Sequence, residues 1–513
     1  MKGLINKMKK TLSLVLAMMM LLLAFTACSD NSADDAGETA APTASAENAG
    51  AEAATDAGSE EPAETTREDV KDGLGEYNFD GLTYRAAQPE SSSYEFYAEE
   101  LTGESTNDAV YNRNLKIEER FNTKIETINF ANTTAVITEV QNLVTSGTDA
   151  FEVATHVAYK AYTPIGTGSY RNWYDVPTVD FTRPWWNNLA NTQNTINGIL
   201  YTATGDINIT SLLNTYAMFF NVDVAQNFGI SAETLYNHVY EGTWTIDKMI
   251  ELTSSIYVDE NGDGIRDNGD TYGYAAWPGI SSDAWLAAFD QPISTKDEEG
   301  FPQAAIMTDK TVAALEKIYN YYNNTDGALG TTTGLISAEY EVTMFVNNQV
   351  VMVPSIFNDA FTEYRHMDAT YGIVPYPKWD EAQEQYLTNA RDQYTVIGIP
   401  LSKTDDSLEF IGVVTEALAA ESWRTVFPEY YNVALKGKYS SDRDTANMVD
   451  LVLAGRNFDF AFLFGEQQFQ RLPYFFRDLL AAGDTNFASK YAKIEKALNK
   501  SLDKLKTFYG YEG

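Results

Sequence analysis

From Leu82 onward the chain alternates short apolar stretches with amphipathic ones, and this alternation limits the fold more than any other feature. LTYRAAQ predicts a strand, NDAVYNRNLKIEERFN a helix with Asn107 or Asp108 as its N-cap, KIETINF a strand, and 134–146 a second helix before the strand FEVATHV. Strands that alternate with helices predict an α/β layer architecture with a mainly parallel sheet.

The same alternation returns in the second half of the chain. ILYTATGDINI, YAMFFNV, QVVMVPSIF, TYGIVPYP and YTVIGIPL predict strands. TIDKMIELTSSIY predicts a helix capped by Thr245, TVAALEKIYNYY another, and LEFIGVVTEALAAES one that follows Ser407, while 444–509 is mostly helical. A folded part of roughly 440 residues is too long for one hydrophobic nucleus, so we expect two or more lobes.

The N-terminus has the pattern of a secretory signal peptide. MKGLINKMKK is basic, an apolar stretch from Leu12 to Ala27 follows, and the stretch ends in FTAC. A single membrane-spanning anchor is the alternative, but the apolar stretch is shorter than the roughly 20 residues that a span needs. Cys28, the only cysteine in the chain, lies at the end of this stretch, and FTAC resembles the lipobox of bacterial lipoproteins. We therefore predict residues 1–27 as a signal peptide and Cys28 as the site of lipid attachment.

Residues 28–75 are predicted to be an acidic, disordered tether. The stretch from Ser29 to Thr66 contains ten acids and neither aromatic residues nor Lys or Arg, so it cannot bury enough apolar surface to become ordered. The whole chain has a formal net charge of −37, which argues against nucleic acid as a partner because phosphate binding requires basic side chains.

Several sequence segments, and their order along the chain, resemble those of the extracellular solute-binding proteins of bacterial ABC importers, the group that includes maltose-binding-type sugar receptors. These segments are NDAVYNRNLKIEERFNTKIE, INGILYTATGDI, YAMFFNVDVAQNFGI, GTWTIDKMIELTSSIYVDENGDGIRDNGDTYGYA, MFVNNQVVMVPSIF, YGIVPYP and EALAAESWRTVFPEYYNVALKGKYSSD. The resemblance implies a two-lobe, type II periplasmic-binding-protein-like fold with hinge crossovers and a ligand cleft. Lobe 1 would comprise 76–204 plus 376–428, and lobe 2 would comprise 205–375 plus 429–513.

The resemblance also implies a function. It predicts a monomeric, non-catalytic receptor, held by its lipid anchor at the outer face of the cytoplasmic membrane, that delivers a small solute to an ABC transporter permease. A carbohydrate, in particular an oligosaccharide, is the expected solute. The crossings would lie near ATGD and IVPYP, where Gly205, Pro375 and Pro377 could absorb the backbone rotation of a hinge.

In open α/β sheets, ligands bind beyond the carboxyl ends of the strands. This rule selects loops after or beside the predicted strands, which also contain Ser91–Ser93, Ser281, Ser282 and Arg391. Trp277 and Phe357 fall where the sugar-binding relatives place stacking aromatics, although core packing is the alternative for each aromatic, as it is for Trp185 and Trp186. The predicted ligand-binding residues are Tyr94, His156, Tyr159, Asp206, Trp277, Phe357, Asn358 and Asp392.

No catalytic motif accompanies these residues. The three histidines lack zinc-binding spacing, and no nucleophile elbow, Walker A loop or GxGxxG fingerprint is present. An exported, anchored polysaccharide-degrading enzyme that uses two carboxylates stays open as the alternative function, since an acidic chain can supply such a pair. The order of segments favours the receptor.

VDENGDGIRDNGDTYGYA has the spacing of a calcium-binding loop. Its expected ligands are Asp259, Asn261, Asp263, the carbonyl of Ile265, Asp267 and Asp270, with Gly264 at the sharp turn. The last position usually carries Glu, and an acidic surface turn is the alternative. Because TYGYAAW after the loop predicts a strand, a helix–loop–helix sensor is not expected. Any calcium would be structural.

Overall fold

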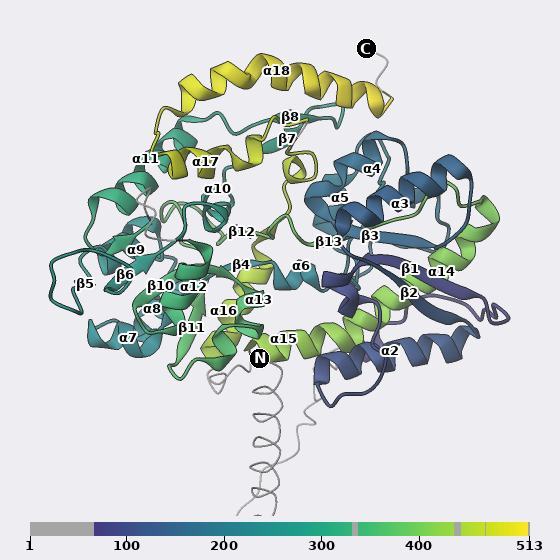
Figure 1. Cartoon of the computed structure of the whole chain (residues 1–513), viewed down its shortest axis with the longest axis horizontal. Coiled ribbons are helices and arrows are strands. Elements are labelled where there is room, and N and C mark those ends of the chain that lie inside the picture. Colours follow the sequence, from purple (N-terminus) through teal and green to yellow (C-terminus); the bar gives the residue numbers. More distant parts are fainter. Residues whose placement is uncertain (1–65, 331–336, 436–442, 467, 511–513) are drawn as a thin grey trace, which may run out of the picture. The chain divides into compact units, whose positions relative to one another are not determined.

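Two β-sheets organise the part of the chain that the structure describes, residues 66–330, 337–435, 443–466 and 468–510 (Figure 1). The predicted signal peptide, Cys28 and most of the tether lie outside these residues. In this computed structural model the first sheet has the order β13 (Thr395–Gly398), β3 (Val153–Val157), β1 (Thr83–Pro89) and β2 (Lys124–Phe130). The second has the order β11 (Tyr371–Val374), β4 (Tyr216–Asn221), β10 (Val350–Ile356), β6 (Thr271–Ala275) and β5 (Tyr257–Val258), with β9 (Ala328–Leu329) beside β6. Two small sheets pair β7 (Ser294–Lys296) with β8 (Pro302–Ala304) and β12 (Thr388–Asn389) with β14 (Arg456–Asn457).

Helices pack around both sheets, which confirms the α/β architecture. Within lobe 1 as predicted, the helices are α2 (Ser105–Phe121), α3 (Thr133–Ser146), α4 (Tyr162–Gly166), α5 (Asn188–Asn194) and α14 (Asp405–Glu421). Those of the remaining chain are α6 (Thr210–Leu213), α7 (Val222–Asn227), α8 (Ala232–Tyr240), α9 (Ile246–Thr253), α10 (Ala284–Ala288), α11 (Asp309–Asn324), α12 (Ala338–Val346), α13 (Phe357–Phe361), α15 (Phe427–Leu435), α16 (Arg443–Ala454), α17 (Phe475–Ala482) and α18 (Phe487–Phe508). The 3-10 helices are η1 (Arg67–Asp69), η2 (Glu90–Glu95), η3 (Ala158–Lys160), η4 (Trp173–Asp175), η5 (Ile280–Ser282), η6 (Tyr364–His366), η8 (Phe460–Phe462) and η9 (Leu472–Tyr474), and η7 (Ser422–Val426) is a π-helix.

The prediction of mainly parallel sheets is wrong for the second sheet. In the first sheet β1 runs parallel to β2 and β3, and only β13 is antiparallel. In the second sheet β4 runs antiparallel to both β10 and β11, whereas β10 and β9 run parallel to β6. β4 and β13 are the first long strands that each sheet receives after the chain arrives from the other sheet. The chain enters each sheet on the side where the neighbouring strands have their carboxyl ends. The new strand must therefore run away from that side, antiparallel to its neighbours.

The segment ILYTATGDINI is not the strand that its apolar content predicts. Ala203 forms an isolated bridge with Ile397, Gly205 forms one with Trp186, and α6 follows. A Cβ atom on Gly205 would lie 2.5 Å from the carbonyl oxygen of Trp185, so the close approach of two backbones requires glycine here. The chain passes between the two sheets in this region, at 375–394, and near η7. The exact lobe boundaries stay a prediction.

Two predicted helix starts differ from the structure. α2 begins at Ser105 with Glu104 as its N-cap, and α14 begins at Asp405 after Thr404, so Ser407 lies inside that helix. The side chain of Thr245 accepts a hydrogen bond from the Lys248 amide, which confirms the predicted cap of α9. Among the described residues, none of the helices combines the length and the apolar character needed to cross a bilayer.

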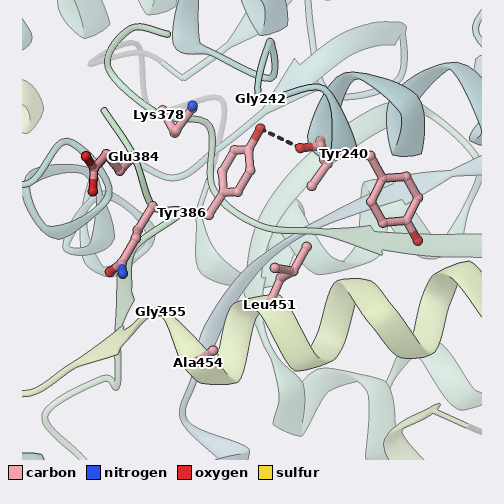
Figure 2. Close-up of a pocket in the computed structure, with 10 residues that line it drawn as sticks. Tyr240, Gly242, Lys378, Glu384, Tyr386, Leu451, Ala454 and Gly455 are labelled. Carbon is pink, nitrogen blue, oxygen red and sulfur yellow. Dashed lines mark hydrogen bonds between the residues drawn. The ribbon is translucent and has the colours of Figure 1, made fainter. Parts of the chain in front are cut away.

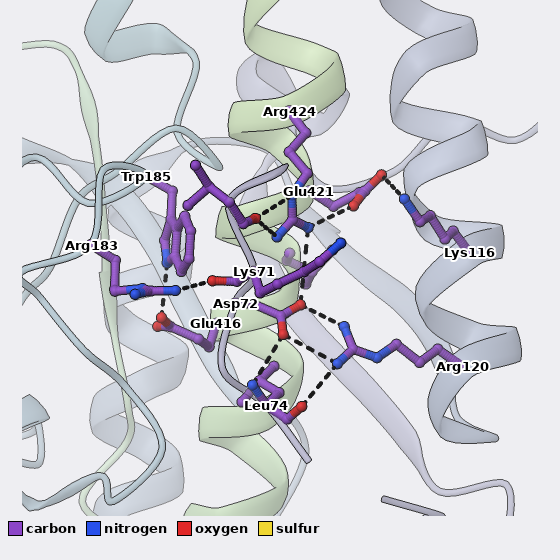
Figure 3. A network of polar contacts seen from close by, with 12 residues as sticks. Lys71, Asp72, Leu74, Lys116, Arg120, Arg183, Trp185, Glu416, Glu421 and Arg424 are labelled. Carbon is purple, nitrogen blue, oxygen red and sulfur yellow. Dashed lines mark hydrogen bonds and ion pairs between the residues drawn. The ribbon is translucent and has the colours of Figure 1, made fainter. Parts of the chain in front are cut away.

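The first described residues, 66–74, form a segment that we call the N-terminal strap, and it lies against η7 and α2 (Figure 3). Arg424 of η7 donates a hydrogen bond of 2.8 Å to the carbonyl oxygen of Val70. Asp72 accepts a hydrogen bond of 2.5 Å from Arg120 of α2, and Arg67 donates one of 2.6 Å to the carbonyl oxygen of Trp423. The strap is therefore an integral part of the folded unit and not a continuation of the tether.

Candidate functional site

The loops at the carboxyl ends of the strands in the first sheet lie beside the loops at the strand ends of the second sheet. The Tyr159 amide, just after β3, donates to the carbonyl oxygen of Asp392 at 3.1 Å. The neighbouring Arg391 amide donates to the carbonyl oxygen of Asn214, just before β4, at 2.7 Å. The amide of Phe357, just after β10, donates to the carbonyl oxygen of Thr215. Loops that the strand-end rule selected separately thus meet at one place.

At this meeting point five side chains form what we call the strand-end cluster: Asp283, Arg391, Asp392, Tyr474 and Arg477. The Tyr474 hydroxyl donates to Asp392 Oδ2 at 2.6 Å, and Arg477 Nη1 lies 2.5 Å from Asp283 Oδ2. The Arg477 guanidinium also lies 4.2 Å from the centre of the Tyr474 ring. The cluster therefore combines two carboxylates, two guanidinium groups and one aromatic ring from three separate parts of the chain.

Burial dominates the electrostatics of the strand-end cluster. It raises the pKa of Asp283 well above its ordinary value, although the charge of Arg477 acts in the opposite direction. Burial also raises the pKa of Asp392, against the hydrogen bond from Tyr474 and the charge of Arg477. These carboxyl groups can exist as neutral acids at a pH where an exposed aspartate is ionised. They can then donate as well as accept hydrogen bonds.

Two polar atoms of the strand-end cluster lack partners within the described residues. Asp283 Oδ1 and Arg391 Nε are both buried, and neither has a hydrogen-bond partner there. Buried polar atoms in native proteins nearly always have a partner, because an unmet donor or acceptor is unfavourable. An acceptor and a donor left open in one cluster are suited to a polar ligand that offers a hydroxyl group to each.

Aromatic and acidic side chains of the second sheet's edge lie around this cluster. Tyr216 and Tyr376 make a T-shaped contact with ring centres 6.4 Å apart. Glu341 accepts hydrogen bonds from the Trp277 amide at 2.6 Å and from the Ser281 hydroxyl, which holds the Trp277 loop in position. Burial raises the pKa of Glu341 to about 8.

Of the eight predicted ligand-binding residues, Asp392 belongs to the strand-end cluster and Tyr159 lies against its backbone. His156 and Phe357, by contrast, are fully buried in the core. The His156 ring stacks on Tyr170 with centres 5.7 Å apart, and burial lowers its pKa to about 4. Strand residues alternate between faces, and sequence alone did not show that both faces are covered here.

The other predicted residues lie outside the strand-end cluster. Tyr94 is 37% exposed on η2, and both Trp277 and Asn358 are half-buried. Asp206 follows Gly205 at the first crossing, where its amide donates to the carbonyl oxygen of Trp185. Burial raises the pKa of Asp206 to about 7, although the charges of Arg456 and Arg67 lower it. Their contact with a ligand stays a prediction.

Sequence reasoning missed three members of the strand-end cluster: Asp283, Tyr474 and Arg477. Asp283 immediately follows the selected pair Ser281–Ser282, so a search one residue wider would have included it. Tyr474 and Arg477 come from η9 and α17, far along the chain and not at the end of any strand. Only the folded structure brings them to this place.

The acidic loop contains all six predicted calcium ligands. Asp259 accepts hydrogen bonds from the amides of Gly262 and Gly264, both at 2.8 Å, and Asp263 accepts one from the Ile265 amide. Asp270 is buried, and it accepts from the Tyr257 hydroxyl and from the Asp267 amide. Within the residues that the structure describes, no group of three or more His, Cys, Asp or Glu side chains is arranged to hold a metal ion. Calcium binding stays a prediction.

The chain matches no family model and no curated protein, but it is similar to solved structures. One is the sugar-binding protein MalE from the phytopathogen Xanthomonas citri, with 13% identity, a TM-score of 0.56, and coverage of 84% of this chain and 100% of that one. Another is the maltose-binding periplasmic protein MalE from Listeria monocytogenes in complex with maltose, with 11% identity, a TM-score of 0.54, and coverage of 85% and 100%. A third is UgpB from Mycobacterium tuberculosis in complex with glycerophosphocholine, with 14% identity, a TM-score of 0.52, and coverage of 83% and 99%. The chain therefore has the two-lobe, type II periplasmic-binding-protein fold that the sequence predicts.

Proposed function

We propose that this protein is a non-catalytic receptor that captures a small solute, in particular a carbohydrate, and delivers it to an ABC transporter. The observation that carries the proposal is the pair of open hydrogen-bonding atoms in the strand-end cluster, Asp283 Oδ1 and Arg391 Nε. They lie where strand ends of the two sheets meet, which is where α/β folds bind ligands.

Carbohydrate chemistry suits this arrangement. A sugar hydroxyl can donate to a carboxylate and accept from a guanidinium at the same time, while the C–H face of the ring packs on an aromatic side chain. Asp283 Oδ1 supplies an acceptor and Arg391 Nε a donor, whereas Asp392, Tyr474 and Arg477 contact one another or Asp283 and hold the cluster together. Two of the similar structures support the class of function: one is a complex with maltose and the other a complex with glycerophosphocholine.

A thermal-shift screen of mono- and oligosaccharides, amino acids and short peptides tests the solute class. We expect a saccharide to raise the melting temperature, because a ligand that binds only the folded state stabilises it. A screen in which no saccharide raises the melting temperature, while another class does, would overturn the carbohydrate assignment.

Arg391→Met should weaken binding of that solute by about 10- to 100-fold in isothermal titration calorimetry, as expected for the loss of one or two buried, charge-assisted hydrogen bonds. Within the described residues the Arg391 side chain forms no hydrogen bond or ion pair and its Nε is open, so the free variant should keep nearly the wild-type melting temperature. Arg365→Met, at an exposed arginine of η6, is the matched control and should bind as the wild type does. Equal affinity of both variants would remove Arg391 from the site.

Turnover distinguishes the receptor from an exported glycosidase. Incubation with labelled glycans should give no product, and release of product would overturn the receptor proposal. The proposal includes anchoring through a lipid on Cys28 at the outer face of the membrane and docking on the permease as a monomer. Mass spectrometry of the mature N-terminus measures whether cleavage precedes Cys28 and whether its thiol carries a lipid.

We propose separately that the acidic loop binds calcium as a structural ion. Millimolar calcium should then raise the melting temperature, and Asp263→Asn should abolish that rise because it removes a charged ligand without changing the shape of the side chain. Magnesium at the same concentration is the control for ionic strength. The absence of a rise with calcium would remove the metal and leave the receptor proposal untouched.

A further inference from the structure

Two lysine side chains are almost fully buried among the described residues, and they differ in their partners. Lys403 and Lys378 are 4% and 3% exposed. The Lys403 ammonium forms ion pairs with Glu152, at 2.9 Å, and with Asp149. The Lys378 ammonium donates to the carbonyl oxygen of Gln383 at 2.8 Å, and no described carboxylate lies within 4.0 Å of it. Lys378 is thus a buried cation without a counter-ion in the part of the chain that the structure describes.

Lys378 lines a cavity of about 410 Å³ (Figure 2). The cavity lies between the end of α8, the segment 378–386, and α16 with the start of β14. Val239, Leu451 and Ala454 supply apolar walls, and the Tyr386 ring lies 5.2 Å from the Lys378 ammonium. The Tyr386 hydroxyl is occupied by its bond to the Val239 carbonyl oxygen, at 3.1 Å. The cavity therefore offers a planar ring, an aliphatic floor and one cation.

An ammonium group removed from water is unfavourable unless an opposite charge or hydrogen-bond acceptors replace the water. One carbonyl oxygen satisfies one of its three donors, and the face of Tyr386 compensates only part of the charge. Gly242 lies close to the ammonium, since a Cβ atom there would lie 3.4 Å from Lys378 Nζ, in van der Waals contact with it. An anionic atom of a ligand would complete the environment of this cation.

We propose that this cavity binds a small organic carboxylate, with its charged end on Lys378 and its apolar body against Tyr386, Leu451 and Ala454. A carboxylate fits better than a phosphate for two reasons. The cavity contributes a single cation, and the exposed Glu384 at its edge disfavours a doubly charged anion. The site is distinct from the strand-end cluster.

Because of the position of the cavity, a bound ligand would contact the segment of chain that connects the two sheets. The Lys378 amide donates to the Trp244 carbonyl oxygen, and the Thr388 amide donates to that of Gly455, which lines the cavity, so both ends of the segment 378–388 are fixed by backbone hydrogen bonds. The same segment continues through β12 to Arg391 and Asp392. A bound carboxylate would hold the segment from which two members of the strand-end cluster emerge.

Benzoate is the probe, because it carries one carboxylate on a planar apolar body, and benzamide is its neutral control of the same shape. Benzoate at about 10 mM should raise the melting temperature of the full-length protein by about 1–3 °C, and benzamide should not. Lys378→Met keeps the aliphatic stem and removes the charge. This variant should lose the response to benzoate and, without any ligand, should melt at or above the wild-type temperature, since an unpaired buried charge is gone.

The matched control is Lys317→Met, because Lys317 also lies over an aromatic ring, that of Trp379, but is ion-paired with Asp247. It should keep the response to benzoate. A response that persists in Lys378→Met, or the absence of any response in the wild type, overturns the proposal. A response to inorganic phosphate alone would replace the carboxylate by phosphate as the ligand. A large fall in the melting temperature of Lys378→Met would show that the lysine serves the fold and needs no anion.

Discussion

Raising the pH from 6 to 8 should lower the stability of this protein by about 6 kcal/mol, since a buried carboxyl group with a folded pKa of about 7 contributes a loss of ~1.4 kcal/mol over this range and one with a pKa of about 8 a loss of ~2 kcal/mol. Among the described residues, four carboxyl groups have a folded pKa of about 7 or 8, and burial raises the pKa of Asp283 and Asp392 in the same direction. Burial raises the pKa of Glu95, Asp206 and Glu416 to about 7, and that of Glu341 to about 8.

The direction in which stability changes with pH follows from the number of protons that the folded and unfolded states bind. In the unfolded chain these carboxyl groups have pKa values of 4.5 for Glu and 3.8 for Asp, so they are ionised at pH 6 to 8. In the folded protein they are still partly protonated over this range. The folded state binds more protons, so stability falls as the pH rises and levels off above about 8. His156 acts in the opposite direction only below its unfolded value of 6.5, because burial lowers its pKa to about 4.

Urea denaturation at pH 6, 7 and 8 measures this slope. Asp206→Asn should reduce this slope by about a quarter, because the amide cannot ionise and the Asp206 side chain takes part in no hydrogen bond with a described residue. Asp290→Asn, at an exposed aspartate, should leave the slope unchanged. A stability that increases from pH 6 to 8 would mean that these four carboxyl groups are ionised in the native protein.

Glu416→Ala should destabilise the protein by about 3–5 kcal/mol, the range for breaking a buried hydrogen-bonded group. Glu416, on α14, accepts hydrogen bonds from both neighbouring indoles: Trp185 Nε1 at 2.8 Å and Trp186 Nε1 at 2.7 Å. Both tryptophan rings are buried, so alanine would leave two donors without an acceptor and a cavity beside them.

Near-UV circular dichroism reports on the two indoles, and urea denaturation on the loss of stability. The loss should be greater at pH 6 than at pH 8, since Glu416 itself weakens the wild type as it ionises. Glu416→Gln, which keeps one acceptor, should fall between alanine and the wild type. Glu409→Ala on the exposed side of the same helix should change stability by no more than about 0.5 kcal/mol. A similar effect of both alanine substitutions would assign the loss to helix α14 and not to the two indoles.

Local sequence patterns predicted much of the fold, because the longer strands and helices of this chain carry their own periodicity. KIETINF is β2 residue for residue, and the predicted cap at Thr245 is present. ILYTATGDINI failed because its apolar residues serve isolated bridges and a close backbone approach at Gly205, which a strand pattern cannot distinguish. Strand direction also escaped prediction, since it depends on the edge at which a crossing chain enters a sheet.

The candidate site was predictable only in part, for a related reason. The strand-end rule selected the loops of Tyr159 and Asp392 because strand ends can be located from sequence. The strand-end rule could not distinguish the last residues of a strand, which are buried, from the exposed residues that follow. It therefore selected His156 and Phe357, although both are buried in the core. The strand-end rule could not select Arg477, because this residue lies on a helix that is distant in sequence from the other members of the cluster.

The N-terminal strap determines where a mechanical load enters the folded unit. A pull on the chain from upstream of residue 66 meets first the bonds of Arg67 and Val70 to η7, and then the ion pair of Asp72 with Arg120. Figure 3 shows these bonds joining the strap to both helices, so the load passes to η7 and α2 before it reaches β1. The parallel pairing of β1 with β2 and β3, which positions the loops of the strand-end cluster, is thereby shielded from tension.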